Sequence, residues 1–428
     1  MMNQVGHLRI DEQRFREDFA CLCRDGATPE DGLNRPALSD AHLTARQTFR
    51  DMILERGFDL RQDGAGNLSA LHCPSSDLQP TLLLGSHLDS VPHGGRYDGT
   101  LGVASAFEVA QVLREVSPDI PVEVIDFTDE EGTWVSLLGS RAMSGQLTPK
   151  DLARPRGNLD AFHRALQRSG LTIDGILSST RHSKEFLGYL EVHIEQGTRL
   201  ECHQTDIGIV TGMVGIHMYL VTFHGEANHA GTTPMNERHD AALGASEFCL
   251  KVHQTVKSDF PDCMATVGQM DFSPGAFNII AGKVTAFMEI RSEDSEQAKD
   301  LENALREQAE IVARTYWLNL DFDHLESVIP QKMDARIARS FESSCQRLEL
   351  SYQTLPSLAG HDAQSMALLC PSGLIFIPSS GGFSHSSREY TPWEACINGA
   401  NVLLHSAIQF MDSVIMKNRH ATELNRSS

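Results

Sequence analysis

The chain has 428 residues, of which 41% are hydrophobic and 22% charged, and its formal net charge at pH 7 is -21. This length suffices for two domains with separate cores, and the composition is typical of a soluble globular protein. The negative charge argues against nucleic acid or an anionic membrane as a partner, because both would be repelled. For the same reason, an anionic substrate needs a basic residue near its binding site.

The amino-terminal sequence MMNQVGHLRIDEQRF has no apolar segment behind a basic start, so we expect no secretory signal. No apolar run approaches the roughly 18 residues that a membrane span needs. The nine cysteines are odd in number and include no CxxC pair. This usage favours reduced thiols, and we therefore expect a cytoplasmic protein.

The first predicted elements are helical. Residues 10–60 are expected to be helix, with Phe15, Phe19 and Leu22 on one face and a second amphipathic run over residues 41–56. The sequence DGAGN at 63–67 predicts a turn after this helical region.

The segment LLLGSHLDSVPHGGRYDGTLGV, residues 82–103, contains the first candidate site. A short leucine-rich strand at 81–84 precedes His87 and Asp89, and Asp98 follows in a glycine-rich loop before a helix. In such α/β units the site lies outside the carboxyl ends of the strands. Imidazole and carboxylate are zinc ligands, and Asp89 is expected to hold His87 in one tautomer. A lone His-x-Asp pair is also typical of a protein surface.

Three further apolar strands are followed by potential ligands. The strand at 121–127 precedes Glu130 and Glu131, the strand at 188–193 ends in His193, and the strand at 373–377 precedes His385. We expect all four strand ends to lie on one rim of a sheet, where their polar groups would gather. That arrangement indicates a metal centre.

The region between the third and fourth of these strands has a different pattern. It predicts strands at 215–224, 264–272, 278–291 and 318–325, and helices at 238–257 and 295–317. The order βαββαβ is that of a ferredoxin-like unit. We therefore predict an α/β protein in which residues 1–212 and 327–428 form a discontinuous catalytic domain and residues 213–326 form an inserted domain.

Five candidate ligands suffice for two divalent cations that share one carboxylate. His87, His193 and Asp98 would hold one cation, while Glu131, His385 and the same Asp98 would hold the other. Such sites keep their metals about 3.5–4 Å apart, activate a bridging water and polarise a carbonyl group.

Glu130 has a different predicted role from its neighbour Glu131. Two adjacent side chains at a strand end diverge, so one can bind a metal while the other faces the open coordination position. Glu130 would then accept the proton of the attacking water and return it to the leaving nitrogen. The alternative for Glu130 and Glu131 is an acidic turn exposed to solvent.

Several motifs follow one another through nearly the whole chain: GSHLDSVPHGGRYDGTLGV, TDEEGTWVSLLGSRAMSG, YLEVHIEQG, ANHAGTTPM, FNIIAGKVTAFMEIRS, AGHDAQSMA and FIPSSGGFSHSSREYT. Together they resemble the dinuclear-metal amidohydrolases of the M20 peptidase superfamily. The resemblance is to the branch of N-carbamoyl-L-amino-acid hydrolases, allantoate amidohydrolases and microbial β-ureidopropionases. It implies a mixed-sheet, metallo-aminopeptidase-like catalytic domain and an inserted domain that acts as a lid and in dimerisation.

The resemblance implies the same five ligands and the same general base as the spacing argument. It also implies a homodimer in which His229 of one subunit helps to hold the oxyanion in the active site of the other. Asn278 and Arg291 match positions that bind the substrate carboxylate, and Gln196 matches a residue near the ureido group. Two divalent metal ions are implied, with zinc expected and manganese, cobalt or nickel as alternatives.

The activity that the resemblance implies is hydrolysis of the ureido C–N bond of an N-carbamoyl amino acid to the amino acid, CO2 and ammonia. Allantoate or N-carbamoyl-β-alanine is an alternative substrate, and an N-acyl amino acid or peptide is another. A non-catalytic binding protein on the same scaffold is the alternative from a different class. The sequence Thr133-Trp134-Val135 departs from the family pattern, and Trp134 is expected to reshape the pocket wall.

Overall fold

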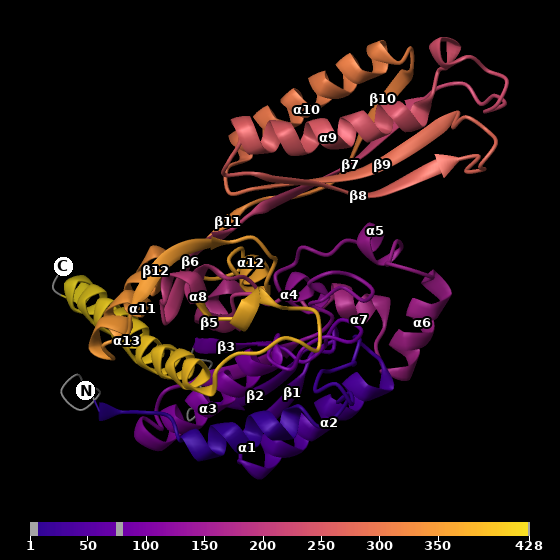
Figure 1. Cartoon of the computed structure of the whole chain (residues 1–428). Helices are drawn as coiled ribbons and strands as arrows, with labels where there is room; N and C mark the ends of the chain where they lie inside the picture. Colours follow the sequence, from indigo (N-terminus) through magenta and orange to yellow (C-terminus); the bar gives the residue numbers. More distant parts are fainter. Residues whose placement is uncertain (1–6, 74–79, 427–428) are drawn as a thin grey trace. The chain divides into compact units, whose positions relative to one another are not determined.

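The computed structural model describes residues 7–73 and 80–426 and divides into two units (Figure 1). The first unit comprises Met1–Thr211, Met333–Leu355 and His361–Ser428, and the second comprises Gly212–Lys332 and Pro356–Gly360. The second unit extends beyond the expected limit of residue 326, and its last strand continues to Val328. Among the described residues, no helix combines the length and the hydrophobicity needed to cross a membrane.

The larger sheet is mixed and has nine strands, in the order β1-β2-β4-β3-β5-β13-β6-β11 with β12 beside β6, and all of them except β11 lie wholly or mostly in the first unit. The strands are β1 (Asp59–Gln62), β2 (Leu68–His72), β3 (Thr81–His87), β4 (Val122–Phe127), β5 (Phe186–Ile194), β6 (Ile207–Met213), β11 (Gln331–Lys332), β12 (Tyr352–Ser357) and β13 (Ser372–Ile377). The four neighbours β4, β3, β5 and β13 run parallel. Their carboxyl ends therefore lie on one rim, as the sequence predicted.

The parallel strands are buried on both faces, which explains their continuous apolar sequences. Alternate residues such as Leu82, Leu84, Leu190 and Val192 belong to the main hydrophobic core. The helices that contribute to this core are α1 (Glu12–Leu22), α2 (Asp40–Glu55), α3 (Thr100–Val116), α11 (Ala335–Arg347) and α13 (Trp393–Arg426). The intervening residues of β3 and β5, including the two histidines near their ends, face away from that core.

The sequence predicted a continuous helical region over residues 10–60, and this prediction is wrong between α1 and α2. Here the chain forms a loop around Arg35, whose guanidinium is fully buried and donates to the carbonyl of Leu22 and the hydroxyl of Thr100. The short strands β1, β2, β6 and β12 were not expected, whereas the turn at 63–67 is confirmed. The loop around Arg35 also contacts Ser90, next to Asp89 at the rim, because the N–H of Arg35 donates to the Ser90 hydroxyl at 3.1 Å.

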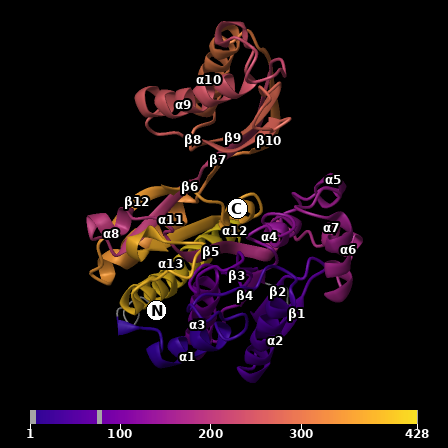
Figure 2. The ribbon, with the colours of Figure 1, turned by 45° about the vertical axis from the view of Figure 1, so that its right-hand side comes forward.

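The second unit contains β7 (Gly215–His224), α9 (Ala241–Asp259), β8 (Met264–Ser273), β9 (Lys283–Ser292), α10 (Ser295–Thr315) and β10 (Asn319–Val328). The strands pair antiparallel in the order β10-β7-β9-β8, and both helices cover one face of this sheet (Figure 2). The predicted α/β architecture with a βαββαβ insertion is therefore confirmed. The strand expected from residue 278 begins only at Lys283, because Ile279 pairs with His229 instead.

Candidate active site

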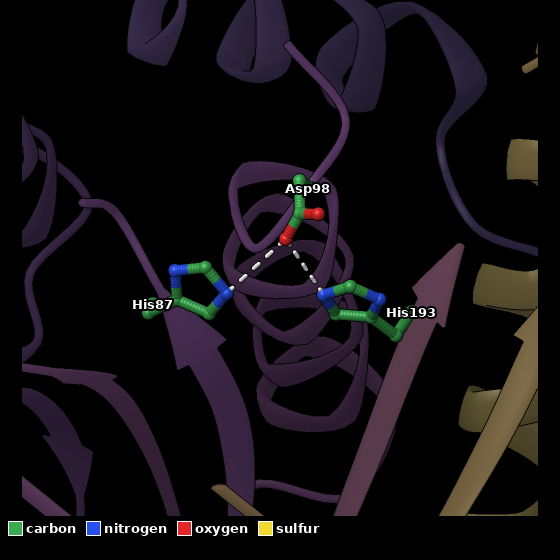
Figure 3. Close-up of side chains that lie close together, drawn as sticks. All are labelled: His87, Asp98 and His193. Atoms are coloured by element: carbon green, nitrogen blue, oxygen red, sulfur yellow. Dashed lines mark ion pairs between the residues drawn. The ribbon is translucent and has the colours of Figure 1, made fainter. Parts of the chain in front are cut away.

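His87, Asp98 and His193 meet at the rim of the parallel strands. His87 is the last residue of β3, His193 lies at the end of β5, and Asp98 comes from the loop before α3. The Nε2 atoms of His87 and His193 lie 3.4 Å and 3.1 Å from the same oxygen, Oδ1 of Asp98 (Figure 3). All three side chains are buried, and their ligand atoms lie within 4.8 Å of one another. This group has the composition of a metal site.

Main-chain carbonyl groups fix the orientation of both imidazoles. Nδ1 of His87 donates to the carbonyl of Asp89 at 3.0 Å, and Nδ1 of His193 donates to the carbonyl of Ile194 at 2.9 Å. Each ring therefore presents the lone pair of Nε2 as a possible ligand, although Nε2 of His193 accepts the main-chain N–H of Gly99 at 3.3 Å. The sequence predicted that the carboxylate of Asp89 holds the His87 tautomer. The main-chain carbonyl of Asp89 is the closer acceptor, because the carboxylate oxygen Oδ1 lies 3.7 Å from Nδ1 of His87.

Gly99 allows the Asp98 loop to approach His87. Its φ is 64°, a left-handed conformation that glycine adopts most readily. A Cβ atom at this position would lie 2.4 Å from the His87 ring. Glycine is therefore required here both by the backbone conformation and by the packing against a candidate ligand.

A second group of ligand atoms shares Asp98 with the first. Nε2 of His385 lies 3.3 Å from Oε2 of Glu131 and 3.8 Å from Oδ2 of Asp98, and the three ligand atoms again lie within 4.8 Å of one another. Asp98 is thus the only residue common to the two groups found among the described residues. The side chain of Gln196 also reaches this oxygen, donating to Oδ2 of Asp98 at 2.7 Å.

The carboxylate of Asp89 holds the turn that carries Glu130 and Glu131. It accepts the main-chain N–H groups of both glutamates at 3.2 Å. Oε2 of Glu130 lies 3.6 Å from Nε2 of His87, so Glu130 borders the first ligand group without belonging to either. Burial raises the pKa of Glu130 well above its usual value, and the charge of Glu131 adds to this effect. A raised pKa suits a group that exchanges protons near neutral pH.

The electrostatics of the rim favour bound cations. Burial raises the pKa of Glu131 well above its usual value, and Asp98 adds to this shift. Burial acts to lower the pKa of His87, but the carboxylates of Glu130, Asp89 and Asp98 outweigh it and raise the pKa well above normal. Buried carboxylates at this density need compensating positive charge, and divalent cations would provide it.

The other predicted substrate residues belong to the second unit. His229 and Asn278 lie on neighbouring segments, since the N–H of Ala230 donates to the carbonyl of Asn278 at 2.9 Å, and both residues are exposed. Arg291 in β9 donates to Glu289 at 2.6 Å and to the carbonyl of Leu358. Within this unit, the side chain of Arg291 is thus already paired.

Trp134 packs against a small hydrophobic cluster of the first unit. Its ring lies 5.6 Å from that of Phe162 in α6 (Leu159–Arg168), in a separate hydrophobic cluster, and its indole N–H donates to the carbonyl of Ala37 at 3.0 Å. These contacts give Trp134 a packing role, and its expected place in the pocket wall stays a prediction.

Sequence reasoning missed several buried polar residues around the ligands. The ring of His361 lies 4.4 Å from that of His193, and Asp362 and Glu191 are buried nearby. Burial raises the pKa of Asp362 well above its usual value, and the charge of Glu191 adds to it. The motif AGHDAQSMA contained the signal for His361 and Asp362, but no spacing rule connected that motif to His193. Glu389, four residues after His385, was also missed.

Comparisons with known proteins identify the family of this chain. A family model described as peptidase family M20/M25/M40 matches residues 83–409. The chain is 33% identical to the N-carbamoyl-L-amino acid amidohydrolase of Geobacillus stearothermophilus, over 94% of this chain and 98% of that protein. It is 31% identical to the allantoate amidohydrolase of Escherichia coli (strain K12), over 90% and 94% of the two chains. The crystal structure of an amidase of the hydantoinase/carbamoylase family from Burkholderia multivorans matches with a TM-score of 0.84 and 30% identity, covering 94% of this chain and 98% of that one. The protein is therefore a hydrolase of amide C–N bonds, and it belongs to the peptidase family M20/M25/M40.

Proposed function

We propose that this protein is a metal-dependent amidohydrolase that cleaves the ureido C–N bond of an N-carbamoyl amino acid to release the amino acid, CO2 and ammonia. The observation that carries this proposal is the pair of ligand groups that share Asp98 beside Glu130. The substrate class is supported by similarity to the N-carbamoyl-L-amino acid amidohydrolase over nearly the full length of both chains. The cysteine usage supports a cytoplasmic location.

The residues at the rim fit two divalent cations. Nε2 of His87 and Oε1 of Glu131 are buried and have no hydrogen-bond partner within the described part of the chain. His87, His193 and Asp98 would hold one cation, and Glu131, His385 and Asp98 the other. When bound, such a pair polarises a carbonyl group and lowers the pKa of water. Zinc is expected from the imidazole and carboxylate ligands, with manganese, cobalt or nickel as alternatives.

Glu130 is the proposed general base. Its carboxylate faces Nε2 of His87, and the turn that carries it is fixed by Asp89. In the first step, Glu130 accepts a proton from the water that attacks the ureido carbon. In the second, it donates this proton to the leaving nitrogen, so that the C–N bond breaks, the amino acid leaves as the free amine, and the carbamic acid that remains breaks down to CO2 and ammonia. Gln196, whose side-chain amide donates to Asp98, would form a hydrogen bond to the ureido group.

Residues of the second unit are proposed to recognise the substrate. Arg291 and Asn278 would bind its carboxylate, for which a guanidinium offers two parallel hydrogen bonds. Nδ1 of His229 accepts the N–H of Gly231 at 3.0 Å, so in the neutral ring Nε2 carries the proton. The exposed ring can thus donate from Nε2 to a developing oxyanion, in a homodimer where each His229 serves the other subunit.

Mixing two inactive variants tests the shared site. We expect His229→Ala and Glu130→Gln to be inactive separately, and activity to return when the two proteins are exchanged into mixed dimers. In a mixed dimer, one of the two active sites would contain both native residues. A protein that sediments as a monomer, or mixed dimers without activity, would contradict a role for His229 across the interface.

The substrate is tested by measuring ammonia release from N-carbamoyl-α-amino acids, N-carbamoyl-β-alanine and allantoate. The protein is first stripped with a chelator and then reloaded with zinc, manganese or cobalt. We expect metal-dependent ammonia from an N-carbamoyl-α-amino acid. If only allantoate or N-carbamoyl-β-alanine released ammonia, that compound would become the proposed substrate. If N-acyl amino acids released acid without ammonia, the proposed reaction would be hydrolysis of an N-acyl bond instead. Failure to bind two metal equivalents would favour a non-catalytic protein.

A further inference from the structure

Glu389 connects the two loops that carry Asp98 and His385. Its side chain is 6% exposed, and its Oε1 accepts the main-chain N–H groups of Tyr97 and Asp98 at 2.8 Å and 3.0 Å. Its other oxygen, Oε2, accepts the hydroxyl of Ser384 at 3.1 Å. One buried carboxylate therefore contacts the loop of the shared ligand and the residue directly before His385.

The loop around Gly95 is shaped to admit this side chain. A Cβ atom at Gly95 would lie 2.1 Å from Cδ and Oε1 of Glu389, so any larger residue would displace the carboxylate. Ser384 completes the connection, because its hydroxyl also lies 2.9 Å from Oδ2 of Asp98. The glycine-rich sequence before Asp98 thus makes room for an acceptor from a segment far away in the chain.

Asp89 provides a precedent within the same rim. Its carboxylate accepts two consecutive main-chain N–H groups, those of Glu130 and Glu131, and so fixes the turn that carries them. Glu389 does the same for Tyr97 and Asp98. A buried carboxylate that accepts two adjacent N–H groups restrains the backbone more than one hydrogen bond would, and ligands held in this way lose less freedom on binding a metal.

We propose that Glu389 is a positioning residue that fixes Asp98 relative to His385, so that both reach one cation. The proposal rests on the dinuclear centre proposed above. Glu389 does not itself bind a metal or the substrate. Its effect is exerted through the main chain of Asp98 and the hydroxyl of Ser384, and it depends on the acceptor oxygens rather than on the negative charge.

Two substitutions of Glu389 separate the effect of its acceptor oxygens from the effect of its negative charge. Glu389→Leu keeps a similar volume but removes both acceptors, and we expect it to weaken metal binding about 10- to 100-fold. Glu389→Gln keeps Oε1 for the two N–H groups, while its amide can donate to Ser384, so its loss should be much smaller. Glu108→Leu is the matched control, because Glu108 is also buried and accepts a main-chain N–H, that of Asp11, but contacts none of the candidate ligands.

The experiment is chelator competition for zinc with the full-length protein, together with the absorption spectrum of the cobalt-loaded protein, both without substrate. We expect Glu389→Leu to weaken binding and alter the spectrum, Glu389→Gln to restore most of both, and Glu108→Leu to change only thermal stability. Unchanged binding in Glu389→Leu, or an equal loss in Glu389→Gln, would overturn the proposal. A wild-type protein that binds fewer than two zinc ions would instead overturn the dinuclear centre itself.

Discussion

The two units present their candidate site residues in opposite ways. In the first unit, His87, Asp98 and His193 are buried and converge on one another at the ends of parallel strands. In the second, His229 and Asn278 are exposed, and Arg291 is paired with Glu289. The first arrangement is incomplete without a ligand, whereas the second is satisfied as it stands.

This difference separates roles that follow from the structure, such as metal binding in the first unit, from roles that do not, such as substrate binding in the second. The buried Nε2 of His87 and Oε1 of Glu131 have no hydrogen-bond partner within the described residues, and burying such groups costs free energy unless something compensates them, which suits a cation. Exposed residues need no such compensation, so their roles depend on the family resemblance. Variants of the first unit should therefore affect metal binding or the chemical step, and variants of the second should affect substrate binding.

The largest expected effect is that of Glu130→Gln. The amide cannot accept a proton, so kcat should fall roughly 100- to 10,000-fold while both metals stay bound. Turnover is measured by ammonia release, and metal content by elemental analysis. Glu131→Gln is the matched variant, because it should lose metal as well as activity. Activity near that of the wild type in Glu130→Gln would remove Glu130 from the role of base.

Metal binding should depend steeply on pH. Burial alone would lower the pKa values of His87 and His193. The neighbouring carboxylates have the larger effect, so both pKa values are raised above normal. Because a cation must displace these protons, affinity should rise with pH, by up to about 100-fold per pH unit for two imidazoles, and level off above the raised pKa values. Chelator competition at several pH values measures this slope, and a flat profile would exclude the two histidines as ligands.

Arg291→Ala tests the second unit. Losing a charged hydrogen bond to the substrate carboxylate should raise KM roughly 10- to 100-fold with little change in kcat or metal content. Arg306→Ala is the control, since Arg306 also pairs with a glutamate, Glu302, but on α10. Equal effects of the two substitutions would show that Arg291 acts only in stability.

The smallest expected effect is that of Trp134→Phe. This change removes the hydrogen bond to Ala37 and should lower the free energy of unfolding by about 1 kcal/mol, leaving kcat/KM unchanged. Thermal unfolding measures the loss, and Trp317→Phe is the control because Trp317 is largely exposed. A change in substrate preference would return Trp134 to the pocket wall.

Four of the five candidate ligands, namely His87, Glu131, His193 and His385, lie at or beyond the carboxyl end of a buried strand, and this pattern is visible in the sequence. An apolar run that ends before His87, Glu131 or His385 indicates that the residue lies at the carboxyl end of a strand. Because the strands run parallel, these ends lie together on one rim of the sheet. The βαββαβ order of the second unit was predictable from its helical and alternating periods in the same way.

Sequence analysis missed residues whose contacts leave no periodic pattern in the sequence. Glu389 is 291 residues from Asp98 and reaches it through a loop. The tautomer of His87 depends on a main-chain carbonyl, which every residue possesses. Short strands such as β1, with mostly exposed residues, have too little apolar contrast to be recognised.

The two groups of candidate ligands differ in where their residues stand along the chain. During translation, His87, Asp98 and His193 emerge before any residue of the second unit, whereas His385 and Glu389 follow it. A nascent chain therefore possesses one complete set of ligand residues long before the other. A protein truncated before β13 would therefore retain at most the first set of candidate ligand residues.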